Sequence, residues 1–381
     1  MSRCRGSAGV GMDSNRESKP LRFFELDGLR GVAALSVLFY HYTFMYEKYY
    51  GHHENPLVTF SRGKLGVDLF FIISGFVILM TISRANSVLD FVVSRVSRIY
   101  PVYWVAIIFT FAVLKIANLW PTGETGKPAL LLNFTMLQRF FSIQSVDGVY
   151  WSLQYELLFY GLMIGVLVVG LIRHVEWVCA GFLGFSLLYW ALLKADVFAS
   201  LGTEGSLIKQ AMLLALILQD IEFFVSGMML YRARKEGITP LRLAIIASAI
   251  GMSFLVDGAL IGCVHAAFVV LVGLAVYGYL PPLKSRVMIF LGGISYPLYL
   301  THQYAGYVLI HKLEAVGLNA NIAIILTIPV AITVATLLSV AVERPALRFI
   351  RDRYAALKQS GKLSRLGAPA VVPIGESTVA R

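Results

Sequence analysis

The chain has 381 residues, of which 57% are hydrophobic and only 14% are charged, and its formal net charge is +11. A large soluble domain carries more charge on its surface, so this composition excludes an ordinary soluble protein and indicates an integral membrane protein. The positive charge could suggest a nucleic-acid-binding protein. In a membrane protein, however, it is typical of lysines and arginines held on the cytoplasmic side. We therefore expect membrane lipids, and no nucleic acid, as partners.

Ten apolar segments are long enough to cross a bilayer as helices. They lie at about 28–45, 65–82, 101–118, 150–171, 175–193, 208–230, 241–256, 259–280, 289–310 and 321–342. With the N-terminus inside, the cytoplasmic segments hold 23 lysines and arginines, and the opposite side holds eight. This asymmetry predicts an all-α, polytopic membrane helix bundle of about ten transmembrane helices with both termini in the cytoplasm.

Three segments fall outside these spans. Residues 1–22 are polar and have no apolar stretch typical of a signal peptide, so we expect a disordered cytoplasmic N-terminal tail. Residues 353–381 are basic and predict a flexible cytoplasmic tail, which leaves 23–352 as the transmembrane domain. Residues 129–146 form a shorter apolar run interrupted by Asn133 and Arg139, which indicates an interfacial or re-entrant piece.

Arg30 and His41 lie in the first apolar segment, eleven residues apart. This offset is close to three helical turns, so both side chains fall on one stripe, about 16 Å apart along the axis. An ionisable side chain inside a membrane helix is costly and typically functional, although a single histidine can simply hydrogen-bond a neighbour. The pair predicts that Arg30 binds an anionic reagent near one membrane face and that His41 transfers protons deeper in the bilayer.

Other spans carry polar groups at a similar depth on the outer side. Glu156 lies about two turns into 150–171 and shares a helix face with Ser152, and Asp68 lies one turn into 65–82. If these groups converge with His41, they form a site; if they do not, they are unrelated buried hydrogen bonds.

The ninth span adds a histidine. Ser295, Tyr299 and His302 follow the i, i+4, i+7 pattern of one helical face, with His302 in the outer half of the span.

On the cytoplasmic side, Arg95 and Arg98 lie three residues apart just before the third span and share a helical face. Guanidinium groups bind phosphate in a planar, often bidentate way, so with Arg30 they predict a phosphate clamp. The alternative is that the two arginines contact lipid headgroups. Asp220 and Glu222 are expected to pair with a cytoplasmic arginine.

No metal site is expected. The run of His52, His53 and Glu54 lies in a polar loop without zinc-ligand spacing and is typical of a solvated turn.

The polar positions above fall in six short runs that resemble, in order, the motifs of the acyltransferase 3 family of bacterial integral-membrane O-acyltransferases. The runs lie at 26–41, 66–76, 95–98, 151–156, 294–302 and 343–345, and the resemblance covers about 22–352. Each run alone is a weak signal, but six in order are specific. Gln154 and Tyr155 depart from the family pattern, in which small or acidic residues are common.

Members of this family move an acyl group, usually acetyl, from cytoplasmic acyl-CoA to a hydroxyl of a surface polysaccharide or glycolipid. The resemblance therefore implies a transmembrane acyltransferase domain over 23–352 in the bacterial cytoplasmic (inner) membrane. It implies acetyl-CoA or another acyl-CoA as co-substrate, a glycan or glycolipid acceptor, and no metal.

The expected site follows from these roles. Arg30, Arg95 and Arg98 would hold the CoA phosphates, and His41 would act as general base or take the acyl group transiently. Glu156 would be the second catalytic residue, orienting His41 or the acceptor. The expected acceptor-binding residues are Asp68, Trp151, Ser152, Tyr299 and His302.

One alternative from another class stays open at this point. The same buried charges could form the substrate or proton path of a secondary transporter or flippase for a sugar or lipid. An enzyme consumes acyl-CoA and a transporter does not, so the acyl donor separates the two.

Overall fold

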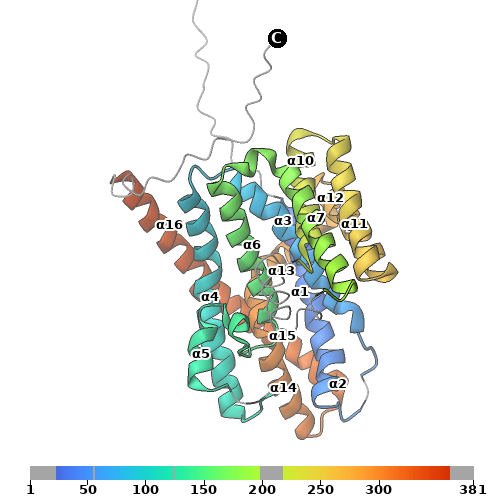
Figure 1. Ribbon diagram of the computed structural model, residues 1–381. Helices are drawn as coiled ribbons and strands as arrows, with labels where there is room; N and C mark the ends of the chain where they lie inside the picture. Colours follow the sequence, from blue (N-terminus) through green and yellow to red (C-terminus); the bar gives the residue numbers. More distant parts are fainter. Residues whose placement is uncertain (1–22, 55, 122, 124, 198–217, 361–381) are drawn as a thin grey trace, which may run out of the picture.

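The computed structural model describes residues 23–54, 56–121, 123, 125–197 and 218–360 (Figure 1). Every regular element in these residues is helical, which confirms the predicted all-α class. The predicted N-terminal tail lies outside the described residues. So do 361–381 of the predicted C-terminal tail and 208–217 of the sixth predicted span.

The α-helices follow one another along the chain. They are α1 (Phe24–Phe39), α2 (Tyr46–Tyr49), α3 (Gly66–Ile82), α4 (Val88–Ala117), α5 (Lys127–Asn133), α6 (Tyr150–Val168), α7 (Val175–Lys194), α10 (Ile221–Glu236), α11 (Pro240–Val256), α12 (Ala259–Val276), α13 (Arg286–Thr301), α14 (Gln303–Ala315), α15 (Ala320–Leu338) and α16 (Arg344–Gln359).

Six helical stretches in the described residues are long and apolar enough to cross a membrane. They are Ser61–Ile82, Val88–Ala117, Tyr150–Val168, Leu171–Lys194, Ala259–Val276 and Ala320–Gln359. The helix Pro240–Val256 is apolar but shorter. The protein is thus a polytopic helix bundle, while ten crossings and the side on which each terminus lies remain predictions.

Helix α4 begins well before the predicted span at 101. The side chain of Ser87 accepts a hydrogen bond from the backbone N–H of Asp90 at 3.1 Å and caps the helix. Arg95 and Arg98 therefore lie within α4 and not in a loop before it. The helix continues through Pro101, as membrane helices often do when other groups satisfy the freed carbonyl.

The predicted span 289–310 is divided at His302. Helix α13 ends at Thr301 and α14 begins at Gln303. Pro297 has no N–H to donate, and the hydroxyl of Thr301 donates to the carbonyl of Pro297 at 2.9 Å. His302 itself keeps α-helical dihedral angles, and its N–H donates to the carbonyl of Leu298 at 3.1 Å. The division places His302 between two helices, where its ring reaches across the bundle.

Two short π-helical segments interrupt the expected α-helices. One covers Tyr40–Met45 and contains His41; the other covers Ser339–Glu343 and contains the glutamate of the motif at 343–345. A π-helical turn changes the direction of the side chains that follow it and is frequent at functional sites. The α-helical spacing used to place Arg30 and His41 on one face therefore applies only up to Phe39, and His41 lies in the π-helical segment that follows.

Glycines let the central helices approach closely. A Cβ atom on Gly292 of α13 would lie 1.9 Å from the carbonyl oxygen of Asp27 in α1. A Cβ atom on Gly227 of α10 would lie 1.9 Å from the carbonyl oxygen of Ile72 in α3. Small residues at such contacts allow backbones to pack tightly in membrane proteins. These two contacts hold α1 and α3, which carry Arg30 and Asp68, at the centre of the bundle (Figure 1).

The apolar run at 129–146 forms no spanning helix. Helix α5 has seven residues and the 3-10 helix Gln138–Phe141 has four, both far too short to cross a bilayer.

At the other end of the sequence, α16 continues to Gln359, so the predicted domain boundary at 352 falls inside a helix.

Candidate functional site

Two cavities lie inside the bundle, and we name them after their charged residues. The arginine cavity has a volume of about 90 Å³, and its polar lining residues are Arg30, Arg95, Arg98, Glu156, Tyr160, Ser74, Ser152, Ser295, Tyr296 and Tyr299. The histidine cavity has a volume of about 560 Å³, and its polar lining residues are His41, Tyr40, Tyr49, Lys64, Asp68, Trp151, Asp220, Asp257, Tyr299 and Gln303. Val67 and Tyr299 line both cavities, so they form the wall between them.

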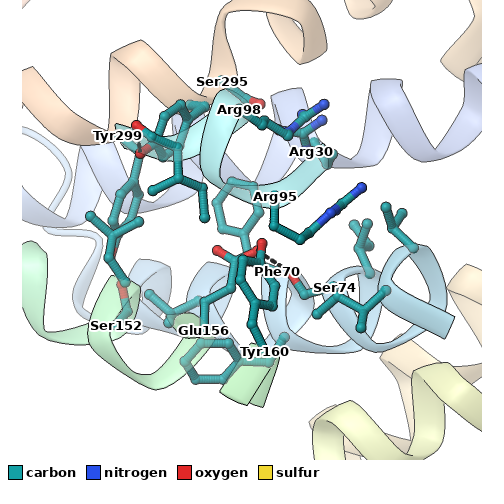
Figure 2. A pocket seen from close by; sticks show the side chains of 18 residues that line it. Arg30, Phe70, Ser74, Arg95, Arg98, Ser152, Glu156, Tyr160, Ser295 and Tyr299 are labelled. Carbon is teal, nitrogen blue, oxygen red and sulfur yellow. Dashed lines mark hydrogen bonds between the residues drawn. The ribbon is translucent and has the colours of Figure 1, made fainter. Parts of the chain in front are cut away.

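The three predicted phosphate-binding arginines meet in the arginine cavity. Arg30 comes from α1, and Arg95 and Arg98 come from α4, where the spacing of three residues puts them on one face. Figure 2 shows the three guanidinium groups toward one end of the cavity, away from Ser152 and Tyr299. Arg95 is buried and donates to the hydroxyl of Thr81 at 2.7 Å. Because like charges repel, this arrangement favours binding of an anion with several charges.

Glu156 lies in the arginine cavity and not beside His41. Its Oε1 atom accepts hydrogen bonds from Tyr160 at 2.6 Å and from Ser74 at 3.1 Å (Figure 2). Its charge acts attractively on Arg30 and Arg95. Glu156 and His41 therefore lie on opposite sides of the wall of Val67 and Tyr299, and the expectation that Glu156 orients His41 or the acceptor stays a prediction.

The wall between the cavities is held by hydrogen bonds. The hydroxyl groups of Ser152 and Tyr299 lie 2.7 Å apart, and both lie within hydrogen-bonding distance of the carbonyl oxygen of Val149, at 3.2 and 3.3 Å. These hydrogen bonds fix the phenol ring of Tyr299, which lines both cavities. Ser152 and Tyr299 are both predicted acceptor-binding residues.

His41 lines the histidine cavity together with Asp68 and Trp151, two other predicted site residues. Its Nδ1 atom lies 2.8 Å from Nε2 of His302. His302 is buried and lies behind His41, outside the lining of either cavity. It contacts the imidazole of His41, and the acceptor contact predicted from sequence stays a prediction.

The hydrogen bonds of His302 determine which nitrogen of His41 carries a proton. Nδ1 of His302 lies 3.0 Å from the carbonyl oxygens of both Leu298 and Tyr299, and a carbonyl can only accept, so this nitrogen is the donor. In a neutral ring Nε2 of His302 then accepts, and His41 donates to it from Nδ1. Nε2 of His41 is left with a free lone pair. The side-chain hydrogen bond of His41 runs from Nδ1, and Nε2 makes none among the described residues.

Asp220 and Asp257 are cavity residues that the sequence did not identify as such. Asp220 was expected to pair with a cytoplasmic arginine; instead, it lines the histidine cavity with Asp68, Asp257 and Lys64. Glu222 is fully buried, and neither carboxylate oxygen has a hydrogen-bond partner among the described residues. Helix α10 begins only at Ile221, so both acids lie at its N-terminal end, and neither lines the arginine cavity. The charge of Arg139, an arginine outside that cavity, acts on Asp220.

Asp147 is another residue whose position the sequence did not indicate. It is fully buried in the loop before α6 and accepts the backbone N–H of Tyr304 at 3.3 Å and that of Val149 at 3.2 Å. It thereby caps the first turn of α14, directly after His302. Burial raises the pKa of Asp147 to about 7, although the backbone N–H groups act in the opposite direction.

Of the run predicted as a solvated turn, His53 and Glu54 are exposed in a bend, whereas the side chain of His52 is packed in the fold. Its Nδ1 atom lies 2.6 Å from Oε1 of Glu314, and its Nε2 atom lies 3.1 Å from the carbonyl of Tyr42. Within the described residues, no group of three or more histidine, cysteine, aspartate or glutamate side chains is placed to hold a metal ion.

Apolar spanning helices that enclose two polar cavities define a polytopic membrane protein with an interior site. The acyltransferase domain of the acyltransferase 3 family matches residues 23–344. The chain belongs to this family and is a membrane acyltransferase.

Curated relatives agree with this assignment. The chain is 30% identical over 342 residues to the exopolysaccharide production protein ExoZ of Rhizobium meliloti (strain 1021), covering 82% of this chain and 96% of that protein. It is 25% identical over 367 residues to the acyltransferase MdmB of Streptomyces mycarofaciens, covering 87% of this chain and 94% of that protein. A comparison with solved structures gives no match.

Proposed function

We propose that the protein is an O-acyltransferase that takes an acyl group, most simply acetyl, from cytoplasmic acyl-CoA. It transfers this group to a hydroxyl of a glycan or glycolipid on the opposite side of the membrane. In this proposal the arginine cavity receives the donor, the histidine cavity receives the acceptor, and the acyl group passes the shared wall of Val67 and Tyr299. The observation that carries it is the adjacency of a polycationic cavity and a cavity lined by a histidine with a free Nε2 atom.

The chemistry of the arginine cavity supports acyl-CoA as the donor. Acyl-CoA carries a diphosphate and a separate phosphate on its ribose, and arginine is the side chain best suited to bind phosphate oxygens in pairs. Arg30, Arg95 and Arg98 offer three such groups at one end of the cavity. A transporter would not need a phosphate site on one side only, and the family assignment also favours the enzyme.

His41 would carry out the transfer step. Nε2 accepts the proton of the acceptor hydroxyl while the oxygen attacks the thioester carbonyl, the C–S bond breaks, and the CoA thiolate leaves and is then protonated. In the alternative order, Nε2 attacks the thioester carbonyl first, the C–S bond breaks and CoA leaves as the thiolate. The hydroxyl then attacks the acyl group on Nε2, the C–N bond breaks, and the proton of the hydroxyl passes to Nε2 and on to the thiolate. Both routes need a neutral ring with an unprotonated Nε2 atom. The contact with His302 supports that state.

The histidine cavity suits an acceptor with many hydroxyl groups. Asp68, Asp257 and Gln303 offer hydrogen-bond acceptors and donors, and Trp151 offers an aromatic face on which a sugar ring can pack. A glycan acceptor is also consistent with the similarity to ExoZ, which is named as an exopolysaccharide production protein. Ten crossings with both termini in the cytoplasm would place the arginine cavity toward the cytoplasm and the histidine cavity toward the outside.

The test is acyl transfer by the purified protein in lipid nanodiscs supplied with radiolabelled acetyl-CoA and a total glycan and glycolipid extract from the parent cells. We expect release of CoA and an alkali-labile label on the extract, as for an O-acetyl ester. Loss of the same O-acetyl group from the surface glycans of a deletion strain would identify the acceptor. Equal CoA release in nanodiscs with and without the protein would contradict the proposal.

A further inference from the structure

Helix α16 is attached to the start of α4, the helix that carries Arg95 and Arg98 (Figure 1). The hydroxyl of Tyr354 donates to Oδ1 of Asp90 at 2.7 Å. Nζ of Lys358 donates to both carboxylate oxygens of Asp90, at 2.9 and 3.0 Å. Asp90 lies in the first turn of α4, so these contacts fix α16 relative to the arginines of that helix.

Arg351 lies on the same face of α16 as these anchors. It precedes Tyr354 by three residues and Lys358 by seven, which is the spacing of neighbours along one helix face. Its guanidinium group is near enough to Arg95 and Arg98 for their charges to act on it. Arg351 is also exposed, so a ligand can reach it.

The arginines of the arginine cavity and Arg351 form no ion pair with a carboxylate among the described residues. Arg351 adds a cation beside Arg95 and Arg98, and the single carboxylate of Glu156 in the cavity balances only part of this positive charge. A bound polyanion would offset the remaining repulsion. The three arginines of the cavity match the diphosphate of an acyl-CoA, and an exposed fourth arginine suits a further phosphate outside the cavity.

We propose that Arg351 is a phosphate-binding residue of the donor site, supplied by a helix beyond the segment 23–344 that defines the family domain. This inference rests on the proposed acyl-CoA donor. The phosphate is the one on the ribose of CoA. A phosphate of a lipid headgroup has the same chemistry and is the other source that the experiment must distinguish.

The chain offers a matched control on the same helix. Arg353 lies two residues on, with its guanidinium group 5.4 Å from the ring centre of Phe349. Phe349 is 62% exposed, so this pair faces away from α4. Arg351→Gln and Arg353→Gln therefore remove the same charge from two different faces of α16. Arg351→Lys keeps the charge but loses the paired geometry of the guanidinium group.

The experiment measures the affinity of the full-length protein for CoA and for dephospho-CoA, which lacks the ribose phosphate, in nanodiscs of neutral phosphatidylcholine. We expect Arg351→Gln to weaken CoA binding about tenfold, as for the loss of one charge-assisted contact, with little change for dephospho-CoA. Arg353→Gln should bind both ligands like the wild type, and Arg351→Lys should fall between. Turnover of acetyl-CoA should show a raised KM at unchanged kcat in Arg351→Gln.

Other results are equally informative. If the phosphate belongs to a lipid, Arg351→Gln binds CoA normally but loses the gain in thermal stability that the wild type shows in phosphatidylglycerol nanodiscs. If Arg351→Gln matches the wild type in CoA affinity and in both lipids, the inference is wrong. Failure of the proposed function looks different, because the wild type would then neither bind CoA nor release it from acetyl-CoA.

Discussion

Nδ1 of His41 lies 2.8 Å from Nε2 of His302, and the two residues are 261 positions apart in the sequence. The carbonyl oxygens of Leu298 and Tyr299 hold the proton of His302 on Nδ1. The contact therefore keeps the proton of His41 on Nδ1 and leaves Nε2 as a base facing the histidine cavity. His302 is in this sense a positioning residue for the histidine that we propose as catalytic.

Replacing His302 tests this relationship. Leucine cannot accept the proton of His41, so we expect His302→Leu to lower kcat about 100-fold, within the usual contribution of a general base. Glutamine can place its Oε1 atom where Nε2 of the imidazole lies, so His302→Gln should keep kcat within about tenfold of the wild type. CoA affinity should not change in either variant. Equal activity of the leucine and glutamine variants would show that the hydrogen bond has no such role.

Val67 offers a test of the route between the cavities. Val67→Phe adds bulk to the shared wall, so we expect acyl transfer to fall about 100-fold while CoA binding stays near the wild-type value, because the arginines are untouched. Val67→Ile is the matched control and should retain most activity. Radiolabel transfer and CoA titration on the same nanodisc preparation check both quantities. Full transfer in a folded Val67→Phe variant would mean that the acyl group takes another path.

Two neighbouring glycines test the packing that holds α1. Gly292→Ala would bring a Cβ atom to 1.9 Å from the carbonyl oxygen of Asp27, and we expect a loss of stability of about 1–3 kcal/mol. A Cβ atom on Gly293 would meet nothing within 4 Å, so Gly293→Ala should be neutral or slightly stabilising. The midpoint of thermal unfolding in detergent compares them. The packing argument fails if both variants unfold at the same temperature.

Asp147 predicts a pH dependence of stability. Its pKa is about 7 in the folded protein and about 4 in an unfolded chain, so the folded protein binds the proton more tightly. Its contribution to stability is complete below about pH 4 and is lost as the pH rises through about 7. We expect the unfolding midpoint of the wild type to fall more between about pH 5 and pH 8 than that of Asp147→Asn, whose amide does not titrate. Parallel curves for the two proteins would contradict this.

Sequence patterns predicted which residues share a helix face more readily than how different helices meet. The chemistry of arginine and the spacing of Arg95 and Arg98 grouped these residues with Arg30, and the structure brings all three to one cavity; phosphate binding there stays a prediction. Helical periodicity also predicted that Ser295 and Tyr299 share a face, and both line that cavity. Residue spacing predicts which side chains share a face of one helix, but it does not predict which helices pack together.

The remaining features depend on contacts between helices. The π-helical turn at His41 and the division of the ninth span at His302 turn two rings toward each other, and no periodicity in either segment indicates it. Glu156 was expected to orient His41 or the acceptor, and the structure places it, with Ser74 and Tyr160, in the cavity that His41 does not line. The position of Tyr160, four residues after Glu156, was the one sequence signal for this arrangement.

The most direct test of the whole account is acetyl transfer by His41→Ala, measured as CoA release and labelled product in nanodiscs at matched amounts of folded protein. We predict that the variant binds CoA with the affinity of the wild type, because the arginine cavity is intact, but forms no product above background. A His41→Ala protein that acetylates the acceptor at the wild-type rate would contradict the account.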